Sequence, residues 1–493
     1  MLVKIPTLRT PEAFRQHCRN LGIEIPCDDT ILTGTASPLT TSPAPPVRLN
    51  GRVPANRWVV QPMEGWDGTS TGGVTEEVRR RWRRFGETGA KILFGGEAMA
   101  VRPDGRANPN QLLLTAGNAE EIRGLIQLAR ASHRAAHGTD EDLVVGLQLT
   151  HSGRFCRPND PGRWEPRVAY RHPLLDARFH VTREDQVLSD EEVKELIGDY
   201  VQAACVARAV GADFIDLKHC HGYLLHEFLG AHTRPGPYGG SFENRTRILR
   251  EIVEGIRRSG NPIDIAVRLS AFDMIPFRKS PAGEAGSGLP DAGTPEPWDP
   301  AHPYHYGFGL DPNSPTTPDL SEPKRFLELC GTLGIRLVNL SAGSPYYTPH
   351  LLRPAAYPPS DGYPPPEDPL VGVARQMAAV RELRASTRGD LALIGSGYTY
   401  LQEFLPHVAQ AAIRAGWVDF VGLGRMVLSY PGILADATTK GAIASRGICR
   451  TFSDCTTAPR NGLPSGCYPL DPHYAAKPEA ARLKEIRSRR PKP

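Results

Sequence analysis

Short runs of β-branched and other apolar residues alternate along this chain with longer segments that carry apolar residues at helical spacing. The short runs cover residues 57–60, 91–94, 143–149, 213–218, 263–269, 335–340, 391–394 and 418–422. Segments with helical spacing lie between several of them, at 190–210, 243–258, 323–333 and 402–415. Repeated strand–helix units predict a parallel sheet of the α/β class. Eight such units favour a closed (β/α)8 TIM barrel, and an open doubly wound sheet is the alternative.

Composition changes outside the predicted barrel, which we place at residues 51–447. Residues 1–50 form an N-terminal extension with a Pro/Ser/Thr stretch at 35–46 that we expect to be irregular chain on the barrel exterior. Residues 448–493 form a C-terminal tail that contains cysteines. Two long insertions rich in proline and glycine, near 280–323 and 343–369, follow the fifth and sixth strands. Because the loops after barrel strands form the catalytic mouth, these insertions either shape a substrate pocket or are disordered decoration.

Charge and cysteine usage exclude several classes of protein. Lysine and arginine total 58 and aspartate and glutamate 54, a net charge of +4 that is too small to predict a nucleic-acid partner. The nine cysteines lack the spacing of a disulfide scaffold, which predicts a reducing cytoplasm. No stretch approaches the ~20 apolar residues of a membrane span, and the amino terminus has no apolar signal core. We therefore expect a cytoplasmic protein that acts on a small molecule, with no membrane partner.

The most specific segment, residues 216–230, follows the fourth predicted strand and reads DLKHCHGYLLHEFLG. Lys218, His221 and Tyr223 can project from it into one pocket and offer an ammonium, an imidazole and a phenol. A lone histidine is more often a structural side chain. A His-Gly-Tyr after a buried strand, followed by YGGSFENR at 238–245, favours an active site.

This segment resembles the old yellow enzyme family, the NAD(P)H:flavin oxidoreductases, and the resemblance spans about residues 55 to 450. It implies an FMN-dependent oxidoreductase that accepts hydride from NADH or NADPH and reduces an activated alkene or related acceptor. By this similarity His221 matches a substrate-binding position and Tyr223 matches the residue that protonates the substrate carbon. Lys218 stands where the family usually has its first histidine. An ammonium can still hold a carbonyl or carboxylate oxygen.

Further family landmarks imply a flavin site. Pro62 and Met63 match residues that lie along the flavin ring, and Ala98 matches the small residue behind it on a segment that resembles the second strand. Gln148 matches the glutamine at the pyrimidine edge. The residue after Met63 is Glu64, where the family usually has Thr, Ser or Cys. We expect this carboxylate either to turn away from the flavin or to lower its potential.

A cation and two glycine-rich strand ends complete the predicted cofactor site. Arg268 matches the family arginine near flavin N1 and O2, where a guanidinium stabilises the reduced, anionic flavin. An ion pair inside the barrel is the alternative. Gly395 and Gly397 follow the seventh strand, and Gly424 and Arg425 follow the eighth. Such turns bind phosphate in barrels, which indicates FMN.

Cys449, Cys455 and Cys467 have the spacing of the cluster-binding cysteines found in the branch of trimethylamine dehydrogenase and 2,4-dienoyl-CoA reductase. The second cysteine of that pattern is replaced here by Phe452. Because a [4Fe-4S] cluster needs four ligands, we expect no iron-sulfur cluster and no metal site. A zinc site completed by a nearby Asp or His is a minor alternative.

Residues 79–84 read RRRWRR and could suggest RNA, since dihydrouridine synthases are flavin barrels that bind tRNA. The chain lacks the Asn-x-Gly-Cys-Pro context of those enzymes. We expect the arginines to be solvated or to pair with Glu76, Glu77 and Glu87. Two other functions stay open: a flavin-dependent amine dehydrogenase or demethylase, and a flavin-binding barrel with little catalytic activity. Proteins of the family that the chain resembles usually form oligomers, which suggests a homo-oligomer.

Overall fold

Eight parallel strands close into a barrel in the computed structural model, which describes residues 2–281, 291–389 and 391–488. The barrel strands are β1 (Trp58–Val60), β2 (Ile92–Leu93), β4 (Val144–Thr150), β5 (Phe214–His219), β6 (Asp264–Ser270), β11 (Leu337–Ser341), β12 (Ala392–Gly395) and β13 (Phe420–Leu423). Their order is β2-β1-β13-β12-β11-β6-β5-β4, and β2 pairs with β4 to complete the circle. The predicted TIM barrel is confirmed, and the open sheet is excluded.

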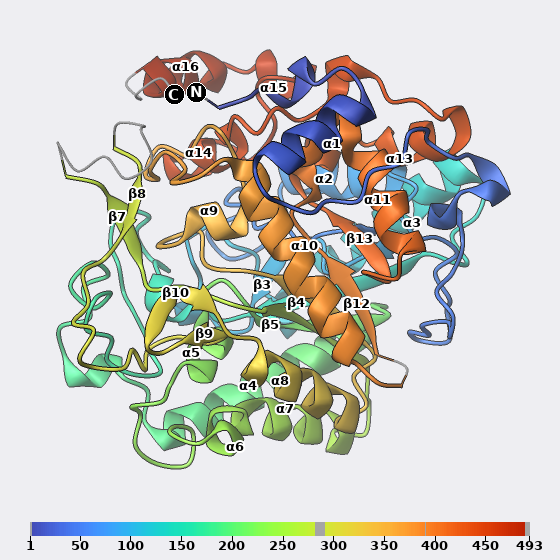
Figure 1. Ribbon diagram of the computed structural model, residues 1–493. Coiled ribbons are helices and arrows are strands. Elements are labelled where there is room, and N and C mark those ends of the chain that lie inside the picture. Colours follow the sequence, from blue (N-terminus) through green and yellow to red (C-terminus); the bar gives the residue numbers. More distant parts are fainter. Residues whose placement is uncertain (1, 282–290, 390, 489–493) are drawn as a thin grey trace.

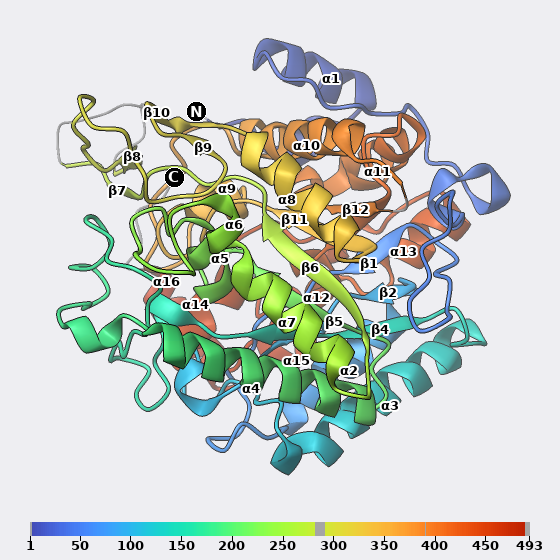
Figure 2. The ribbon, with the colours of Figure 1, turned by 90° about the horizontal axis from the view of Figure 1, so that it is seen from below.

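Helices follow the strands and form the outer layer of the barrel. Figure 2 shows this arrangement for the helices drawn in green and yellow. The principal ones are α2 (Glu76–Glu87), α3 (Ala119–His137), α4 (Asp190–Ala209), α7 (Arg247–Arg258), α8 (Ser321–Thr332), α10 (Pro369–Ser386), α11 (Leu405–Arg414) and α12 (Arg425–Ser429). Local sequence explains the sharp start of α4. Ser189 accepts a hydrogen bond from the backbone N–H of Glu192, whose side chain in turn accepts from the N–H of Ser189.

The barrel interior is a packed core at its amino-terminal end. The buried side chains that fill it are Val59, Ile92, Phe94, Val144, Phe214, Ala266, Leu337, Ala392, Ile394 and Phe420. Gly146 on β4 is required there, because a Cβ at this position would lie 2.3 Å from the Phe214 ring. Filling this end of the barrel leaves the opposite end, where the strands finish, to hold a ligand.

The N-terminal extension is more ordered than the sequence indicated. Its helix α1 (Pro11–Asn20) packs on the barrel wall, with the Phe14 ring 4.6 Å from the Phe404 ring. The Pro/Ser/Thr stretch contains two 3-10 turns, Gly34–Ala36 and Pro38–Thr40. Val47 and Leu49 then join the buried side chains of the barrel interior. The extension therefore contributes to the barrel core as well as lying outside it.

Within the described residues, the two insertions form regular elements that the sequence pattern did not predict. The first contains the antiparallel pairs β7 (Phe277–Lys279) with β8 (Gly293–Pro295) and β9 (Leu310–Asp311) with β10 (Ser314–Pro318), seen in yellow-green and yellow in Figure 1. The second carries the short helix α9 (Pro349–Leu352). Residues 282–290 of the first insertion lie outside the described part of the chain. The segment between the two hairpins is also packed, since Phe308 and Tyr304 are 1% and 2% exposed. This burial argues against the disordered alternative for the part described.

The C-terminal tail folds back over the arginine-rich helix α2 (Figure 1). It contains α14 (Asp454–Arg460), α15 (Pro472–Ala475) and α16 (Glu479–Ser488). Arg80 and Arg84 pair with Asp471 of the tail.

Most arginines of α2 form ion pairs with other parts of the chain, and most of the expected carboxylate partners were wrong. Arg83 alone is paired as expected, with Glu76 at 3.9 Å, whereas Glu77 pairs with Lys477. Arg81 is buried between Asp67 and Glu97. No helix in the described ranges is long and apolar enough to cross a membrane.

Candidate active site

An open cavity of about 1330 Å³ lies at the carboxyl ends of the barrel strands. It is where a TIM barrel places its active site. The structure brings together ten of the residues singled out from the sequence around this cavity: Pro62, Met63, Gln148, Lys218, His221, Tyr223, Arg268, Gly397, Gly424 and Arg425.

Two predicted cofactor residues lie outside the cavity lining. Ala98 belongs to the short strand β3 (Ala98–Ala100), which pairs with β4 alone and is separate from the second barrel strand β2. Gly395 is the last residue of β12, and it is the next residue, Ser396, that reaches the cavity. Gly397 has a φ of 92°, a left-handed conformation that favours glycine and turns the chain away from the strand.

Tyr223 lies beside a carboxylate and an ammonium. Its hydroxyl donates a hydrogen bond to Oε2 of Glu64 at 2.6 Å, and the same oxygen lies 3.4 Å from Nζ of Lys218. Nζ of Lys218 also stands 3.3 Å from the centre of the Tyr223 ring. Burial and the charge of Glu64 hold the pKa of Tyr223 well above its usual value. Tyr223 therefore stays a protonated phenol. Glu64 lines the cavity and turns toward these two side chains.

His221 is held in a fixed orientation at the same end of the barrel. Its φ of 66° is unusual for a residue with a side chain, and its backbone N–H donates to Oγ of Ser270. Nε2 lies 2.9 Å from Oγ of Ser341. Burial, with the nearby cations Arg268 and Lys218, lowers the pKa of His221 well below its usual value. The imidazole is therefore neutral and can donate or accept one hydrogen bond at each nitrogen.

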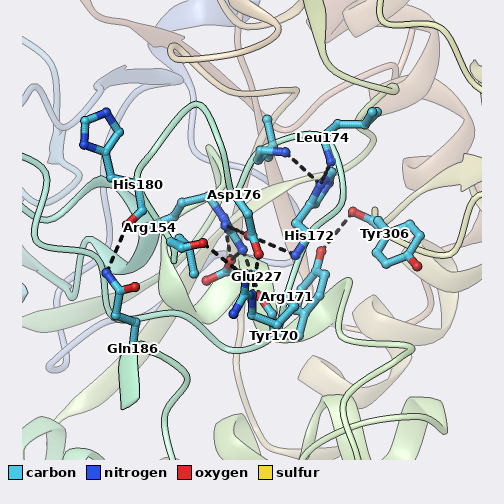
Figure 3. A network of polar contacts seen from close by, with 12 residues as sticks. Arg154, Tyr170, Arg171, His172, Leu174, Asp176, His180, Gln186, Glu227 and Tyr306 are labelled. Atoms are coloured by element: carbon cyan, nitrogen blue, oxygen red, sulfur yellow. Dashed lines mark hydrogen bonds and ion pairs between the residues drawn. The ribbon is translucent and has the colours of Figure 1, made fainter. Parts of the chain in front are cut away.

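A buried ion-pair network anchors α5 (Leu224–Leu229), the helix that begins directly after Tyr223. Figure 3 shows Arg154 between Glu227 of α5 and Asp176 of the loop that follows β4. The guanidinium also donates to the carbonyl of Tyr170 at 2.9 Å. The side chains of Arg154 and Glu227 are 2% and 5% exposed. The network thus joins a long loop to the segment that carries Tyr223.

Gln148 and Arg268 lie on neighbouring sides of a buried carboxylate that the sequence analysis did not single out. Asp216 stands opposite Gln148 in the β4–β5 register, and Oδ2 of Asp216 accepts a hydrogen bond from Nε2 of Gln148. Burial raises the pKa of Asp216 to about 7, although Gln148 and Arg268 act in the opposite direction. With its amide nitrogen directed at Asp216, Gln148 keeps its amide oxygen available to a ligand. Arg268 donates to the carbonyl of Pro62 at 3.2 Å.

One end of the cavity is cationic and contains Arg353, Arg425 and Arg460. Arg460 pairs with Asp361. Among the described residues, Arg353 and Arg425 have no carboxylate within ion-pair distance, and each has a buried guanidinium nitrogen without a hydrogen-bond partner. Burial and the neighbouring Arg460 and Arg425 lower the pKa of Arg353 to about 9. Two uncompensated guanidinium groups at one end of a cavity favour an anion.

Arg353 and Arg460 were missed by the sequence analysis. Arg353 lies in the second insertion, just after α9, and Arg460 ends α14 in the C-terminal tail. Neither segment has a motif that points to the barrel mouth. The pair is identified only once the chain is folded.

The three tail cysteines lie close to the same end, but they do not form a metal site in the structure. Cys455 lines the cavity, Cys449 is buried, and Phe452 packs against the Tyr357 ring at 5.3 Å. In the described ranges, no group of three or more His, Cys, Asp and Glu side chains could hold a metal ion. The minor zinc alternative is therefore not supported.

Comparison with solved structures supports the fold. The chain is similar to a 2-naphthoyl-CoA reductase in complex with 2-naphthoyl-CoA, with a TM-score of 0.63, 16% identity and coverage of 89% of this chain and 57% of that one. It is also similar to morphinone reductase in complex with tetrahydroNAD, with a TM-score of 0.52, 19% identity and coverage of 83% and 92%. At these identities the likeness concerns the fold alone.

Sequence comparison finds similarity to one family of flavoproteins. The model of the NADH:flavin oxidoreductase / NADH oxidase family matches residues 46–283, which include the whole 216–230 segment. This part of the chain is therefore similar to that family. Proteins similar to the chain include the NADPH dehydrogenase of Bacillus subtilis (strain 168), 30% identical over 233 residues, which are 46% of this chain and 63% of that protein. The NADH oxidase of Thermoanaerobacter brockii is 26% identical over 387 residues, or 78% of this chain and 48% of that protein. The matches thus span about half to two thirds of these relatives' own lengths.

The cavity fits FMN, the cofactor of the NADH:flavin oxidoreductase family. Arg268, Arg353 and Arg425 line the cavity together with Met63 and Gln148. Each of the three arginines has a buried nitrogen without a hydrogen-bond partner in the described structure. A phosphate dianion satisfies two guanidinium groups, and the electron-rich edge of a flavin satisfies a third. The donor set therefore matches the charges of FMN.

Proposed function

We propose that the chain is an FMN-dependent oxidoreductase that takes hydride from NADH or NADPH and reduces an activated alkene or related acceptor. The observation that carries this proposal is the placement of Tyr223, His221 and Lys218 together at the barrel mouth, beside Gln148 and Arg268. Bound FMN supplies the chemistry of hydride acceptance and delivery.

The residues of the chain divide into a cofactor set and an acceptor set. Gln148 and Arg268 would hold the pyrimidine edge of FMN, and Pro62 and Met63 would contact its ring. Gly397, Gly424, Arg425 and Arg353 would surround the phosphate. On the acceptor side, His221 and Lys218 donate hydrogen bonds to an electron-withdrawing oxygen, which makes the conjugated carbon more electrophilic. Tyr223 gives its hydroxyl proton to the neighbouring carbon.

An amine dehydrogenase is less consistent with the charges around the cavity. A cationic amine substrate requires a free carboxylate or an aromatic cage. Glu64 is the one carboxylate lining the cavity in the described residues, and it is already paired with Lys218. The aromatic rings of the lining already have cations beside them: Arg157 at Trp66, Lys218 at Tyr223 and Arg460 at Tyr346.

Absorption spectroscopy of the purified protein tests the proposed function. Flavin absorption bands that bleach on anaerobic addition of NADPH or NADH, and return when an alkene such as 2-cyclohexenone is added, are the expected result. A protein that neither carries nor takes up FMN would contradict the cofactor assignment. A flavin that no nicotinamide reduces would favour the barrel with little catalytic activity.

Replacing Arg353 by methionine should weaken FMN binding and leave riboflavin binding unchanged. One charged hydrogen bond contributes about 1.5–3 kcal/mol, which predicts a loss of roughly tenfold to a hundredfold in FMN affinity. Fluorescence titration of the flavin-free protein with FMN and with riboflavin measures both constants. Arg446→Met, at an exposed position just before the tail, is the control. Equal losses for the two flavins would contradict a phosphate contact.

The reduction of the alkene should not slow as the pH rises toward the ordinary phenol pKa of ~10. Tyr223 acts as an acid, and its raised pKa keeps the active, protonated form present at higher pH. In Glu64→Gln, loss of the nearby negative charge lowers the pKa of Tyr223, so the alkaline decline should move to lower pH. Single-turnover rates of the reduced protein with an alkene, recorded against pH, measure this. An alkaline decline at the same pH in both proteins would contradict the role of Glu64.

A further inference from the structure

Lys218 is an ammonium group buried where the acceptor is expected. Its side chain is 3% exposed, and Nζ lies over the Tyr223 ring at 3.3 Å from the ring centre. A buried ammonium needs a negative partner, because removing the charge from water has a large energetic cost. If nothing else supplied that partner, this position would favour a carboxylate on the acceptor.

Glu64 supplies the negative partner, and both of its oxygens are engaged. Oε2 receives the Tyr223 hydroxyl at 2.6 Å and faces Nζ of Lys218 at 3.4 Å. Oε1 accepts from Nε1 of Trp66 at 3.2 Å, and the backbone N–H of Trp66 donates to Oγ of Ser465 in the C-terminal tail. The carboxylate is thus fixed from three sides.

The segment around Glu64 is also packed too tightly to swing outward freely. A Cβ at Gly65 would lie 2.4 Å from Nη1 of Arg81 and 2.4 Å from Oε2 of Glu97. The guanidinium of Arg157 lies 4.6 Å from the centre of the Trp66 ring. Glu64 therefore belongs to a rigid wall of the cavity.

We propose that Glu64 is a specificity-determining residue that makes the acceptor side of the cavity electrically neutral and so selects uncharged acceptors over carboxylates. This inference rests on the proposed function and restricts its acceptor to molecules without a negative charge. A carboxylate bound to Lys218 would stand next to Oε2 of Glu64, and the two like charges would repel. The oxygen of a neutral group accepts from Lys218 and His221 without that repulsion.

The other cations of the cavity are used elsewhere. Arg81 is paired with Asp67 and Glu97, and Arg460 with Asp361. Arg268 also lines the cavity and is assigned to the pyrimidine edge of the cofactor. Arg353 and Arg425 form the separate cationic end assigned to the cofactor phosphate. Lys218 is therefore the cation beside Tyr223 whose charge decides between neutral and anionic acceptors, and Glu64 neutralises it.

Calorimetric titration of the FMN-loaded protein with benzamide and benzoate tests the inference without turnover. These probes have the same ring and differ in charge. The unaltered protein should bind benzamide more tightly than benzoate. In Glu64→Gln, benzoate affinity should rise by roughly tenfold or more, because Lys218 loses its partner, while benzamide affinity changes by less than about threefold.

Two further variants separate charge from shape. Glu64→Asp keeps the negative charge and should keep the preference for benzamide. Adding Lys218→Met to Glu64→Gln removes the cation and should abolish the gain for benzoate. A preference for benzoate in the unaltered protein, or an unchanged benzoate affinity in a folded Glu64→Gln protein, would overturn the inference. Failure of NAD(P)H to reduce the flavin would contradict the proposed function, and the benzamide and benzoate affinities would still decide the charge selectivity.

Discussion

Replacing Tyr223 by phenylalanine is expected to slow alkene reduction by ~10²–10⁴-fold, the usual contribution of a positioned acid. The phenol of Tyr223 is the protonated acid at the barrel mouth, and its hydroxyl donates a hydrogen bond to Oε2 of Glu64 at 2.6 Å. Flavin reduction by NAD(P)H needs no proton from this residue and should keep its rate. Stopped-flow measurement of the two half-reactions separates these effects.

Tyr346→Phe provides the matched control for the Tyr223 prediction. The hydroxyl of Tyr346 lies 3.4 Å from that of Tyr223, so its removal changes the same surroundings without removing the proposed acid. We expect a much smaller effect on alkene reduction. Equal rates for Tyr223→Phe and the unaltered protein with every alkene tried would contradict the assignment of Tyr223 as proton donor.

Replacing Arg154 by methionine is expected to lower the free energy of unfolding by ~3–5 kcal/mol, because it leaves Glu227 and Asp176 without their buried cation. The pKa of Glu227 is already raised by burial in spite of Arg154. In the variant the carboxyl group of Glu227 binds a proton more readily when the protein is folded, so the loss of stability should be greater at neutral pH than at acidic pH. Urea unfolding at both pH values measures this.

Arg171→Met is the control for the ion-pair network in Figure 3. Arg171 also contacts Asp176, but its side chain is 41% exposed, and exposed pairs contribute about 0–1 kcal/mol. A loss of stability as large in Arg171→Met as in Arg154→Met would contradict the importance of burial. Because the network holds α5 directly after Tyr223, the Arg154 variant should also lose activity before it unfolds.

The barrel was predictable because it depends on a local pattern. Each strand is a short apolar run, and all eight runs identified in the sequence overlap the observed barrel strands. The site was predictable where functional residues lie at the end of a strand or directly after it. Lys218 lies at the end of β5, and His221 follows that strand. Ala98 was assigned to the second strand incorrectly, because the turn at Gly95 and Gly96 separates β2 from β3.

The orientation of Glu64 could not be predicted from its place in the chain. Its position after Met63 suggested an effect on the flavin, with the side chain either turned away or lowering the potential. The structure directs it to Tyr223 and Lys218, which are more than 150 residues further along the chain. Only closure of the barrel, which brings the end of β1 across from the end of β5, makes that contact.

The sequence by itself determined the strand–helix order, the barrel and the identity of the residues at the strand ends, because these depend on periodicity and on motifs within single segments. Tertiary structure alone decided which charges meet. Arg353 from an insertion joins Arg425, Asp471 of the tail joins Arg80, and Glu64 joins Lys218. A charge is stable in a buried position only when the fold brings a partner or a ligand to it, and the partners of these groups come from distant parts of the chain.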